Sequence, residues 1–254
     1  MYSSRDLLCR AHGNESDCRN CVAKHISICS SVDQTGLAEL RSVATLSSHK
    51  EGQILFDEDQ ELDRVCIVLE GMIKLYHLLP DGRRQITGFL GPGDILGGIK
   101  RHATSHCAAE AITDVKLCGF DRARFFRLLH EQPDLCMNLL IAATDEIEAQ
   151  HNHATLLGRR RADERLAAFL LLLSHRWPRD DYVDEVVALP MSRADIADHL
   201  GQTIESVSRG LRKFKRLGYI QLPKPSLVVL KNIPALCQLA GFEDMPPRNI
   251  TLGI

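Results

Sequence analysis

The stretch 203–218, TIESVSRGLRKFKRLG, constrains the fold of this chain more than any other part of the sequence. On a helix of 3.6 residues per turn, its apolar and polar side chains separate onto two faces. The apolar face holds Ile204, Val207, Leu211 and Phe214, and the polar face holds Glu205, Ser208, Arg209 and Arg212. Arginine can bond guanine twice and glutamate can accept from a cytosine amino group, as base edges in a DNA major groove require. We therefore predict a helix that packs through one face and reads DNA with the other.

Residues on the N-terminal side of this stretch predict a second, shorter helix and a sharp turn. Ser192, three residues before Asp195, is typical of a helix N-cap with an acidic first turn. Gly201 can end that short helix, and Thr203 can cap the next one. Together these signals predict a helix-turn-helix.

Residues on the C-terminal side predict a small β-hairpin. The apolar runs 219–222 and 227–230 are joined across two prolines. A hairpin at this place is the wing of a winged helix-turn-helix. The alternative is an amphipathic surface helix with solvated charges, but the caps, the turn, the wing and the cations all favour DNA reading.

The side chains of the predicted DNA-reading helix divide into two roles. We expect Arg209 to bond a guanine, Glu205 a cytosine amino group, and Ser208 a thymine or a nearby phosphate. The remaining cations are expected to hold backbone phosphates, which position a protein without reading sequence. They are Arg212, Lys213 and Arg216.

Charge is distributed unevenly along the 254 residues. The formal net charge is −2, so the whole chain has no basic field that announces a nucleic-acid partner. Residues 159–254 nevertheless hold 15 Lys and Arg against 11 Asp and Glu, and residues 209–216 hold five cations and no anion. The pattern fits an acidic sensor half followed by a basic reader half.

Between residues 52 and 120 the sequence changes to short strand-like runs cut by glycine. The predicted strands are QILF, VCIVL, MIKLYHLL, RQITGFL and AITDVKLCGF. Asp81-Gly82 lies between two of them, which is a strong hairpin signal. Short strands at this spacing predict a small barrel or jelly roll. A short helix is expected before it, within residues 33–49, and a strongly apolar core helix after it, at residues 164–173.

A heptad-like series begins after the strand region and predicts a helix that pairs with a second copy. Spacings of 4, 3, 4, 3, 4 and 3 connect its members, as in the seam of a two-stranded coiled coil. The members are Cys136 and the seam residues Leu140, Ala143, Ile147, Gln150, Ala154 and Leu157. The alternative is an amphipathic helix packed only on its own domain.

Four of the nine cysteines lie in the first 29 residues, where few apolar residues accompany them. Cys18, Cys21 and Cys29 are spaced C-x2-C-x7-C, with His25 between the last two. A bound metal would order such a segment. Spacing alone leaves a Cys3His zinc site, an iron-sulfur site and a metal-free thiol switch open.

An enzyme is the alternative from another class, and the sequence gives it little support. We find no glycine-rich phosphate cradle, no nucleophile motif and no paired carboxylates, and the HATSHC stretch with His102, His106 and Cys107 is expected to be a loop. We therefore predict that the protein is not an enzyme. The first 13 residues lack the apolar core of a signal peptide, and no apolar run reaches membrane-span length, so a cytoplasmic protein is expected.

With these pieces in place, the chain resembles the Crp/Fnr family of bacterial transcription factors, and within it the Fnr type. The resemblance runs from about Cys18 to Gly241. It is most specific at Glu205-x-x-Ser208-Arg209, at ADERLAAF (162–169), at DGRRQITGF (81–89) and at the cysteine group.

The resemblance implies an α+β fold: an N-terminal β-roll like that of cyclic-nucleotide-binding domains, a long dimerisation helix and a C-terminal winged helix-turn-helix. We expect five segments along the chain. They are a cysteine-rich cluster-binding segment at 1–31, the β-roll sensor at 32–130, the dimerisation helix at 131–160, the winged helix-turn-helix at 161–235 and a C-terminal tail at 236–254.

The resemblance also implies ligands and partners. Fnr-type members hold a [4Fe-4S] cluster that senses oxygen, and the matching residues are Cys18, Cys21, Cys29 and Cys118. The implied partners are a second copy of the chain, RNA polymerase and a DNA inverted repeat of the TTGAT kind.

The sequence departs from family patterns at two places. Cyclic-nucleotide-binding members have a Gly-Glu pair and an Arg-Ser pair that hold the ribose and the phosphate. The corresponding stretches here are Gly93-Asp94 and Ser105-His106, which lack the phosphate-binding arginine, so cyclic AMP is not expected to bind. Where oxygen-sensing relatives have a seam aspartate that keeps the cluster-free form monomeric, this chain has Gln150, which puts the completeness of that switch in question.

Overall fold

The computed structural model describes most of the chain between Cys18 and residue 243. The described residues are 18, 21, 23–30, 32–97, 104–159, 161–176 and 186–243. Several sequence-based expectations lie outside them, namely Cys9, His102, most of the 1–31 segment and the tail from residue 244.

The chain divides into two compact units, and the division does not follow the order of the sequence. The first unit comprises the described residues up to Leu75 together with Leu90–Ala143. The second comprises Tyr76–Phe89 together with the described residues from Thr144 onward. A hairpin from the middle of the strand region therefore belongs to the same unit as the predicted helix-turn-helix.

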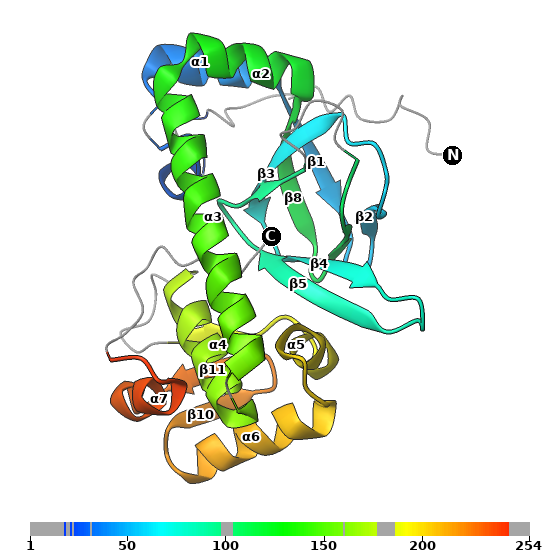
Figure 1. The fold of residues 1–254 in the computed structure, drawn as a ribbon. Coiled ribbons are helices and arrows are strands. Elements are labelled where there is room, and N and C mark those ends of the chain that lie inside the picture. The colour runs from blue at the N-terminus through cyan, green and yellow to red at the C-terminus, as the bar shows by residue number, and fades with distance from the viewer. Residues whose placement is uncertain are drawn as a thin grey trace. The chain divides into compact units, whose positions relative to one another are not determined.

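Eight strands form the predicted roll (Figure 1). They pair into two four-stranded sheets of order β1-β8-β3-β6 and β2-β7-β4-β5. Their bounds are β1 Ala44–His49, β2 Ile54–Phe56, β3 Arg64–Glu70, β4 Ile73–Leu78, β5 Arg84–Leu90, β6 Ile95–Leu96, β7 Ala108–Ala111 and β8 Val115–Asp121. The antiparallel pairing of β8 with both β1 and β3 places Cys118 opposite Leu46 on one side and Ile67 on the other.

The structure corrects two details of the strand region. The expected helix within 33–49 ends early, because α1 spans Gln34–Val43 and the next six residues form β1. The run AITDVKLCGF is two strands and not one, since residues 112–114 turn the chain between β7 and β8. Thr113 stabilises this turn by accepting a hydrogen bond from the backbone N–H of Met72 at 3.0 Å.

Two apolar clusters form the core of the first unit. One fills the roll and includes Val68, Ile73, Leu90 and Leu117. The other joins α1, α2 (Arg122–Glu131) and the start of α3 (Pro133–Arg159) to strands β3 and β8. The described cysteines Cys18, Cys21, Cys29 and Cys118 all pack against this second cluster.

The helices of the second unit bury a core around α4, Ala162–Arg176. Contacts join α4 to α5 (Arg193–Leu200), α6 (Ile204–Arg216) and α7 (Ile233–Ala240). The sequence predicts the beginning and end of α5: Ser192 and Asp195 form a capping box, and Gly201 ends the helix at φ 58°. The expected core helix at 164–173 is the central part of α4.

The predicted wing is the hairpin of β10 (Ile220–Lys224) and β11 (Leu227–Leu230), with β9 (Val186–Ala188) added as a third strand. The expected boundary between reader domain and tail, at residue 235, falls inside α7. Over the described ranges, none of the helices is both long enough and apolar enough to span a membrane.

Candidate DNA interface and cysteine site

The two predicted faces of α6 are present in the structure. Val207, Gly210, Leu211 and Phe214 are buried, whereas Glu205, Arg209 and Arg212 are exposed and Ser208 is half-buried. Ile204, expected on the apolar face, is 49% exposed because it begins the helix. The Thr203 hydroxyl caps the helix by accepting from the backbone N–H of Ser206 at 3.2 Å. The helix therefore packs through one side and leaves the other to solvent.

The exposed face of α6 keeps donors and acceptors available. The carboxyl group of Glu205 has a lowered pKa, mainly because its own backbone N–H hydrogen-bonds it, and secondarily because of Thr203 and the Arg209 guanidinium. It is therefore an ionised acceptor at neutral pH. Arg212 donates through Nε to the backbone oxygen of Ser208 at 3.2 Å, which orients its side chain along the helix.

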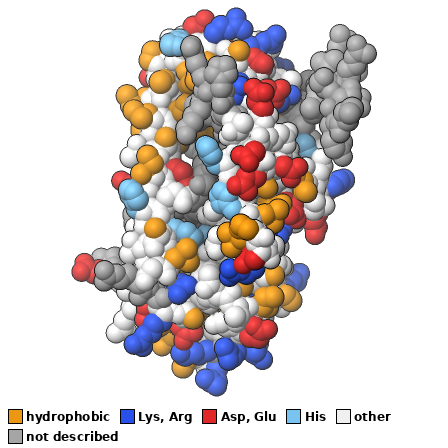
Figure 2. Space-filling model, turned by 45° about the vertical axis from the view of Figure 1, so that its right-hand side comes forward, with side chains coloured by type: hydrophobic (Ala, Val, Ile, Leu, Met, Phe, Trp, Pro, Cys, Tyr) orange, Lys and Arg blue, Asp and Glu red, His pale blue; other side chains and the backbone are white. Residues whose placement is uncertain are grey.

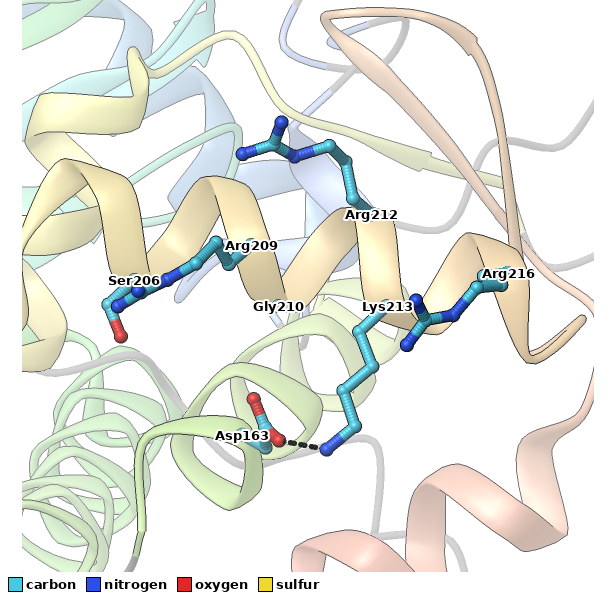
Figure 3. Close-up of a pocket in the computed structure, with 7 residues that line it drawn as sticks. All are labelled: Asp163, Ser206, Arg209, Gly210, Arg212, Lys213 and Arg216. Atoms are coloured by element: carbon cyan, nitrogen blue, oxygen red, sulfur yellow. Dashed lines mark hydrogen bonds and ion pairs between the residues drawn. The ribbon is translucent and has the colours of Figure 1, made fainter.

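The basic side chains of α6 contribute to the lining of a pocket of about 580 Å³ (Figure 3). Its lining consists of Asp163, Ser206, Arg209, Gly210, Arg212, Lys213 and Arg216. In Figure 3, Lys213 points toward Asp163, whereas Arg212 points to the opposite side of the helix. Figure 2 shows Lys and Arg side chains gathered over this part of the second unit. A concave surface with four cations fits a polyanion.

Sequence reasoning missed Asp163 as part of this surface. It belongs to α4, and its Oδ2 accepts from Nζ of Lys213 at 2.5 Å. The two residues are 50 positions apart. The ADERLAAF motif was the available signal, although nothing in it says which cation its aspartate meets.

The second candidate site lies in the first unit, where the structure brings together the four cysteines that the resemblance selects. The pKa of Cys29 is raised to about 11, mainly by burial. A hydrogen bond with Ser27 opposes the shift, and the thiols of Cys18 and Cys21 add to it. Burial is also the largest cause of the raised pKa of Cys118. The thiols of Cys29, Cys18 and Cys21 raise this pKa further. These effects indicate that Cys29 and Cys118 lie in poorly solvated surroundings and near the thiols of Cys18 and Cys21.

The surroundings of this cysteine group distinguish its members from His25. The side chain of His25 is exposed, whereas Cys118 shares the apolar cluster with Cys18, Cys21 and Cys29. Cys66 is also close enough to raise the pKa of Cys118, and burial raises its own pKa to about 11. Neither Cys66 nor its proximity was anticipated.

The donor set fits a thiolate-bound metal group in kind, because soft sulfur ligands suit zinc and iron-sulfur clusters. Within the described part of the chain, no three Cys, His, Asp or Glu side chains are arranged to hold a metal ion. Burial keeps the thiols of Cys29 and Cys118 protonated at neutral pH, because it raises the pKa of both.

The segment that holds these cysteines is attached to both the roll and the long helix. Asn138 of α3 donates to the backbone oxygen of Ile28 at 2.9 Å. A Cβ at Gly93, where φ is +94°, would lie 2.5 Å from the backbone oxygen of Ile26. Both contacts lie within the first unit, so the cysteine segment is fixed next to the N-terminal part of α3.

The residues that would correspond to a cyclic nucleotide site are engaged in local structure. Asp94 accepts from the backbone N–H of Gly91 at 2.7 Å, which closes its own turn. Ser105 is buried and donates to the backbone oxygen of Cys107. The described side chains here offer no arginine to a phosphate.

The predicted seam of α3 is solvent-exposed within one chain. Leu140 is 61% exposed and Ile147 is 57% exposed, and Ala143 and Ala154 are exposed as well. Gln150 is half-buried and donates to Oε1 of Glu146, one turn earlier, at 2.9 Å. Leu157 is half-buried. An exposed apolar row on a 27-residue helix is typical of a surface that a partner covers.

Comparisons with known proteins agree with this architecture. A family model described as a cyclic nucleotide-binding domain matches residues 46–132, and one described as a Crp-like helix-turn-helix domain matches residues 164–239. Nitrogen fixation regulation protein FixK of Bradyrhizobium diazoefficiens is 41% identical over 205 residues, which are 81% of this chain and 86% of that protein.

A second relative and a solved structure extend the comparison. Transcriptional activator protein FnrL of Cereibacter sphaeroides is 31% identical over 231 residues, which are 89% of this chain and 93% of that protein. The solved structure of FixK2 from Bradyrhizobium japonicum has a TM-score of 0.71 at 35% identity, and the match covers 78% of this chain and 97% of that one.

Proposed function

Because this chain belongs to the Crp/Fnr family of DNA-binding transcription regulators, we propose that it controls anaerobic or microaerobic genes by binding TTGAT-type inverted repeats as a dimer. Members of the family are transcription regulators and not enzymes, and its Crp-like helix-turn-helix binds DNA. The operator sequence, the individual contacts and the signal are the proposed parts.

One observation carries the operator proposal: the exposed face of α6 presents Glu205, Ser208 and Arg209 on a capped, well-packed helix. A carboxylate, a hydroxyl and a guanidinium at this spacing match guanine, cytosine and thymine edges in a major groove. In a symmetric dimer, two copies of α6 would enter successive major grooves, which calls for an inverted repeat. Arg212, Lys213 and Arg216 would hold phosphates.

For the signal, we propose a [4Fe-4S] cluster held by Cys18, Cys21, Cys29 and Cys118. The support is that these four thiols pack on one apolar cluster and that Cys18 and Cys21 help to raise the pKa of both Cys29 and Cys118, whereas His25 is exposed. When bound, such a cluster would supply oxygen-sensitive iron chemistry. What the chain supplies is apolar surroundings for the cysteines, and the Asn138 contact that fixes the cysteine segment beside α3.

Two other readings of the same cysteines remain candidates. A zinc ion would use His25 as its fourth ligand instead of Cys118, and a metal-free redox switch would use the thiols alone. The iron-sulfur cluster needs Cys118 as its fourth ligand, whereas the zinc ion needs His25. The redox switch differs from both because it needs no metal.

The roll is proposed not to take cyclic AMP. The support is the closed turn at Asp94, the sequence Ser105-His106 where the family has its phosphate-binding Arg-Ser pair, the hydrogen bond of Ser105 to the backbone oxygen of Cys107, and the apolar filling of the roll. RNA polymerase is the proposed partner at promoters, as a regulator of transcription requires.

A gel shift on a TTGAT palindrome, run anaerobically and in air, tests the operator and the signal together. We expect a specific shift without oxygen that weakens in air, and a scrambled duplex of the same composition provides the control. If air does not change binding to the palindrome, the proposed oxygen sensing is wrong. If the palindrome and the scrambled duplex bind equally well, the proposed operator sequence is wrong.

The metal is tested on anaerobically purified variants. Cys118→Ala should lose the broad visible absorbance of a cluster, whereas Cys107→Ala, elsewhere in the roll, should keep it. If Cys118→Ala retains its metal and His25→Ala loses it, the site is zinc. If the wild-type protein contains neither iron nor zinc and air still changes DNA binding, the thiols alone respond.

A further inference from the structure

The ADERLAAF motif at 162–169 has no role in the function proposed above, although it is among the most specific parts of the sequence. It forms the first two turns of α4, directly after the long helix. Asp163 and Arg165 contact the helix-turn-helix, whereas Glu164 accepts a hydrogen bond from the backbone N–H of Arg161 at 2.9 Å.

The motif ties the start of α4 to the turn between α5 and α6. Arg165 donates through Nη1 to the backbone oxygens of Leu200 at 2.7 Å and Gly201 at 3.2 Å. In return, Gln202 donates through Nε2 to the backbone oxygen of Ala162 at 2.9 Å. Carbonyl groups left over at the end of α5 are thereby satisfied by a side chain of α4. The turn that aims α6 is thus held from α4.

The middle of α6 lies directly against the same turn of α4. A Cβ at Gly210 would lie 2.6 Å from Cδ2 of Leu166 and 3.6 Å from Oδ1 of Asp163. Glycine is needed here for close approach and not for its backbone angles. One turn further along α6, Lys213 reaches Asp163 and forms the 2.5 Å ion pair.

Asp163 is the single carboxylate among the seven residues that line the α6 pocket, and four of the others are cations. The ion pair is partly exposed, with Lys213 at 45% and Asp163 at 34%, so it lies where phosphates would arrive. To neutralise a phosphate, Lys213 must either break its ion pair with Asp163 or contact Asp163 and the phosphate at the same time.

We propose that Asp163 is a specificity-determining residue: it holds Lys213 and fixes α6 against α4, which limits binding to random DNA and favours binding to the operator. Non-specific binding is almost entirely a sum of phosphate contacts, so withholding one cation weakens it. Operator binding depends in addition on how accurately α6 is aimed at the bases, and the same pair helps to fix that aim. Asp163 therefore acts through Lys213 and touches no base.

The test is the salt dependence of DNA binding by Asp163→Asn. Affinity for a random duplex should rise about three- to tenfold at moderate salt, and the slope of log K against log salt should steepen by about one contact. Affinity for the operator should rise less or fall, so the ratio of the two affinities drops. Asp163→Glu, which keeps the charge, should restore the wild-type ratio.

The double variant Asp163→Asn, Lys213→Ala separates an electrostatic role from a merely structural one. If Asp163 acts through Lys213, removing Asp163 from a Lys213→Ala protein should not change the salt slope. Asp114→Asn, which breaks the exposed Lys50–Asp114 pair of the first unit at 2.6 Å, makes the same change in net charge and should leave both affinities near wild type.

An unchanged affinity ratio in Asp163→Asn, or an equal loss on both duplexes, would overturn the proposal. So would a steeper salt slope that persists without Lys213. The proposal rests on DNA binding by α6 and uses the TTGAT palindrome only as the specific probe. If the wild-type protein does not prefer the palindrome, the proposed operator has failed. The proposal for Asp163 can still be tested in that case, because Asp163→Asn must steepen the slope of log K against log salt on random DNA.

Discussion

At the scale of single residues, Arg209 has the most specific predicted role, which is to bond a guanine base. It is exposed on α6, and it contributes to lowering the pKa of Glu205, one turn earlier. A bidentate contact to guanine discriminates against the wrong base by about 1–3 kcal/mol. We expect Arg209→Ala to weaken operator binding by that amount and to relax preference at one base pair, measured by competition with single-base operator variants.

Arg216→Ala provides the matched control for Arg209→Ala, because it removes the same charge from the exposed end of the same helix. It should weaken operator and random duplex alike and flatten the salt slope by about one contact. Equal losses on both duplexes from Arg209→Ala as well would contradict its role at a base.

His199 of α5 is a buried residue whose titration should be visible in stability. It is 1% exposed and lies against Phe89, Phe169 and the stacked ring of His153, with ring centroids 4.3 Å apart in the histidine pair. Burial, and secondarily His153, lower its pKa from 6.5 to about 3, although its bond to the backbone oxygen of Ile86 opposes the shift.

The direction of this pH effect follows from which state binds the proton. Between pH 6.5 and 3 the unfolded chain protonates the imidazole and the folded protein does not, so the free energy of unfolding falls as the pH falls. From pH 7 to 5 the loss is about 2 kcal/mol from this residue. Denaturant titrations should show a smaller loss for His199→Gln than for wild type. An identical pH dependence would mean that His199 is not kept neutral.

At the scale of elements, the hairpin of β4 and β5 matters most, because its residues Tyr76–Phe89 belong to the unit that holds the helix-turn-helix. Nη2 of Arg84 lies 2.9 Å from Oδ1 of Asp195 and 3.2 Å from Oδ2 of Asp198. Gln85 donates to the backbone oxygen of Asp198 at 2.7 Å. The hairpin thus holds α5, the first helix of the helix-turn-helix.

We expect Arg84→Ala to lower the free energy of unfolding by about 1–3 kcal/mol. The Asp195 side chain is only 8% exposed and would lose its cation, but Arg84 is 27% exposed, so solvent screens part of the effect. Asp195 would keep its bonds to Ser192. Thermal and urea unfolding measure the change.

The neighbouring Arg83 provides the control for Arg84→Ala. It pairs with Asp81 at 2.7 Å, but both side chains are largely exposed, at 77% and 51%. Such a pair contributes about 0–1 kcal/mol, so Arg83→Ala should be nearly neutral. A similar loss from both variants would show that the hairpin tip, and not the contact with α5, determines stability.

These elements also show what the sequence could and could not predict. The caps at Ser192, Thr203 and Gly201 are local signals, and they correctly predicted where α5 and α6 begin and where α5 ends. The Arg84–Asp195 pair joins residues 111 positions apart, and no local pattern encodes it. For the same reason the DGRRQITGF motif predicted a hairpin but not that the hairpin holds α5.

In the candidate sites, too, local patterns predicted some residues, and contacts between distant parts of the chain brought in the others. The 3.6-residue period was enough to select the exposed residues of α6, whereas Asp163 entered the surface through a contact between two helices. The cysteine spacing left zinc and iron-sulfur open. Cys118 could be selected only through the resemblance, because strand pairing in the roll brings it to the N-terminal cysteines.

At the scale of the whole molecule, the exposed row on α3 calls for a second copy. Crp/Fnr relatives are dimeric regulators, and the row's apolar members Leu140 and Ile147 are both more than half exposed within one chain. Ile147→Glu should leave the fold intact and give a monomer with weak operator binding. Asn152→Glu, exposed on another face of α3, should stay dimeric. Sedimentation velocity distinguishes the two outcomes, and a dimeric Ile147→Glu would place the interface elsewhere.

We expect Gln150 to influence how firmly the two copies associate. Its amide donates to Glu146 at 2.9 Å, so the seam contains a neutral, hydrogen-bonded side chain at this position. An aspartate there would place a carboxylate one turn from Glu146 and opposite its own copy across the seam, and like charges at such positions repel. We expect Gln150→Asp to raise the dimer dissociation constant about tenfold, which corresponds to about 1.4 kcal/mol.

The effect of Gln150→Asp should depend on salt and pH if repulsion is its cause. Raising the ionic strength or protonating the carboxylates near pH 4 should return the dissociation constant toward that of wild type, as measured by sedimentation equilibrium. Gln150→Asn, neutral and as short as aspartate, separates charge from length. If Gln150→Asn weakens the dimer as much as Gln150→Asp does, the contact with Glu146 matters and the charge does not. If neither variant changes the dissociation constant, Gln150 is not in the seam.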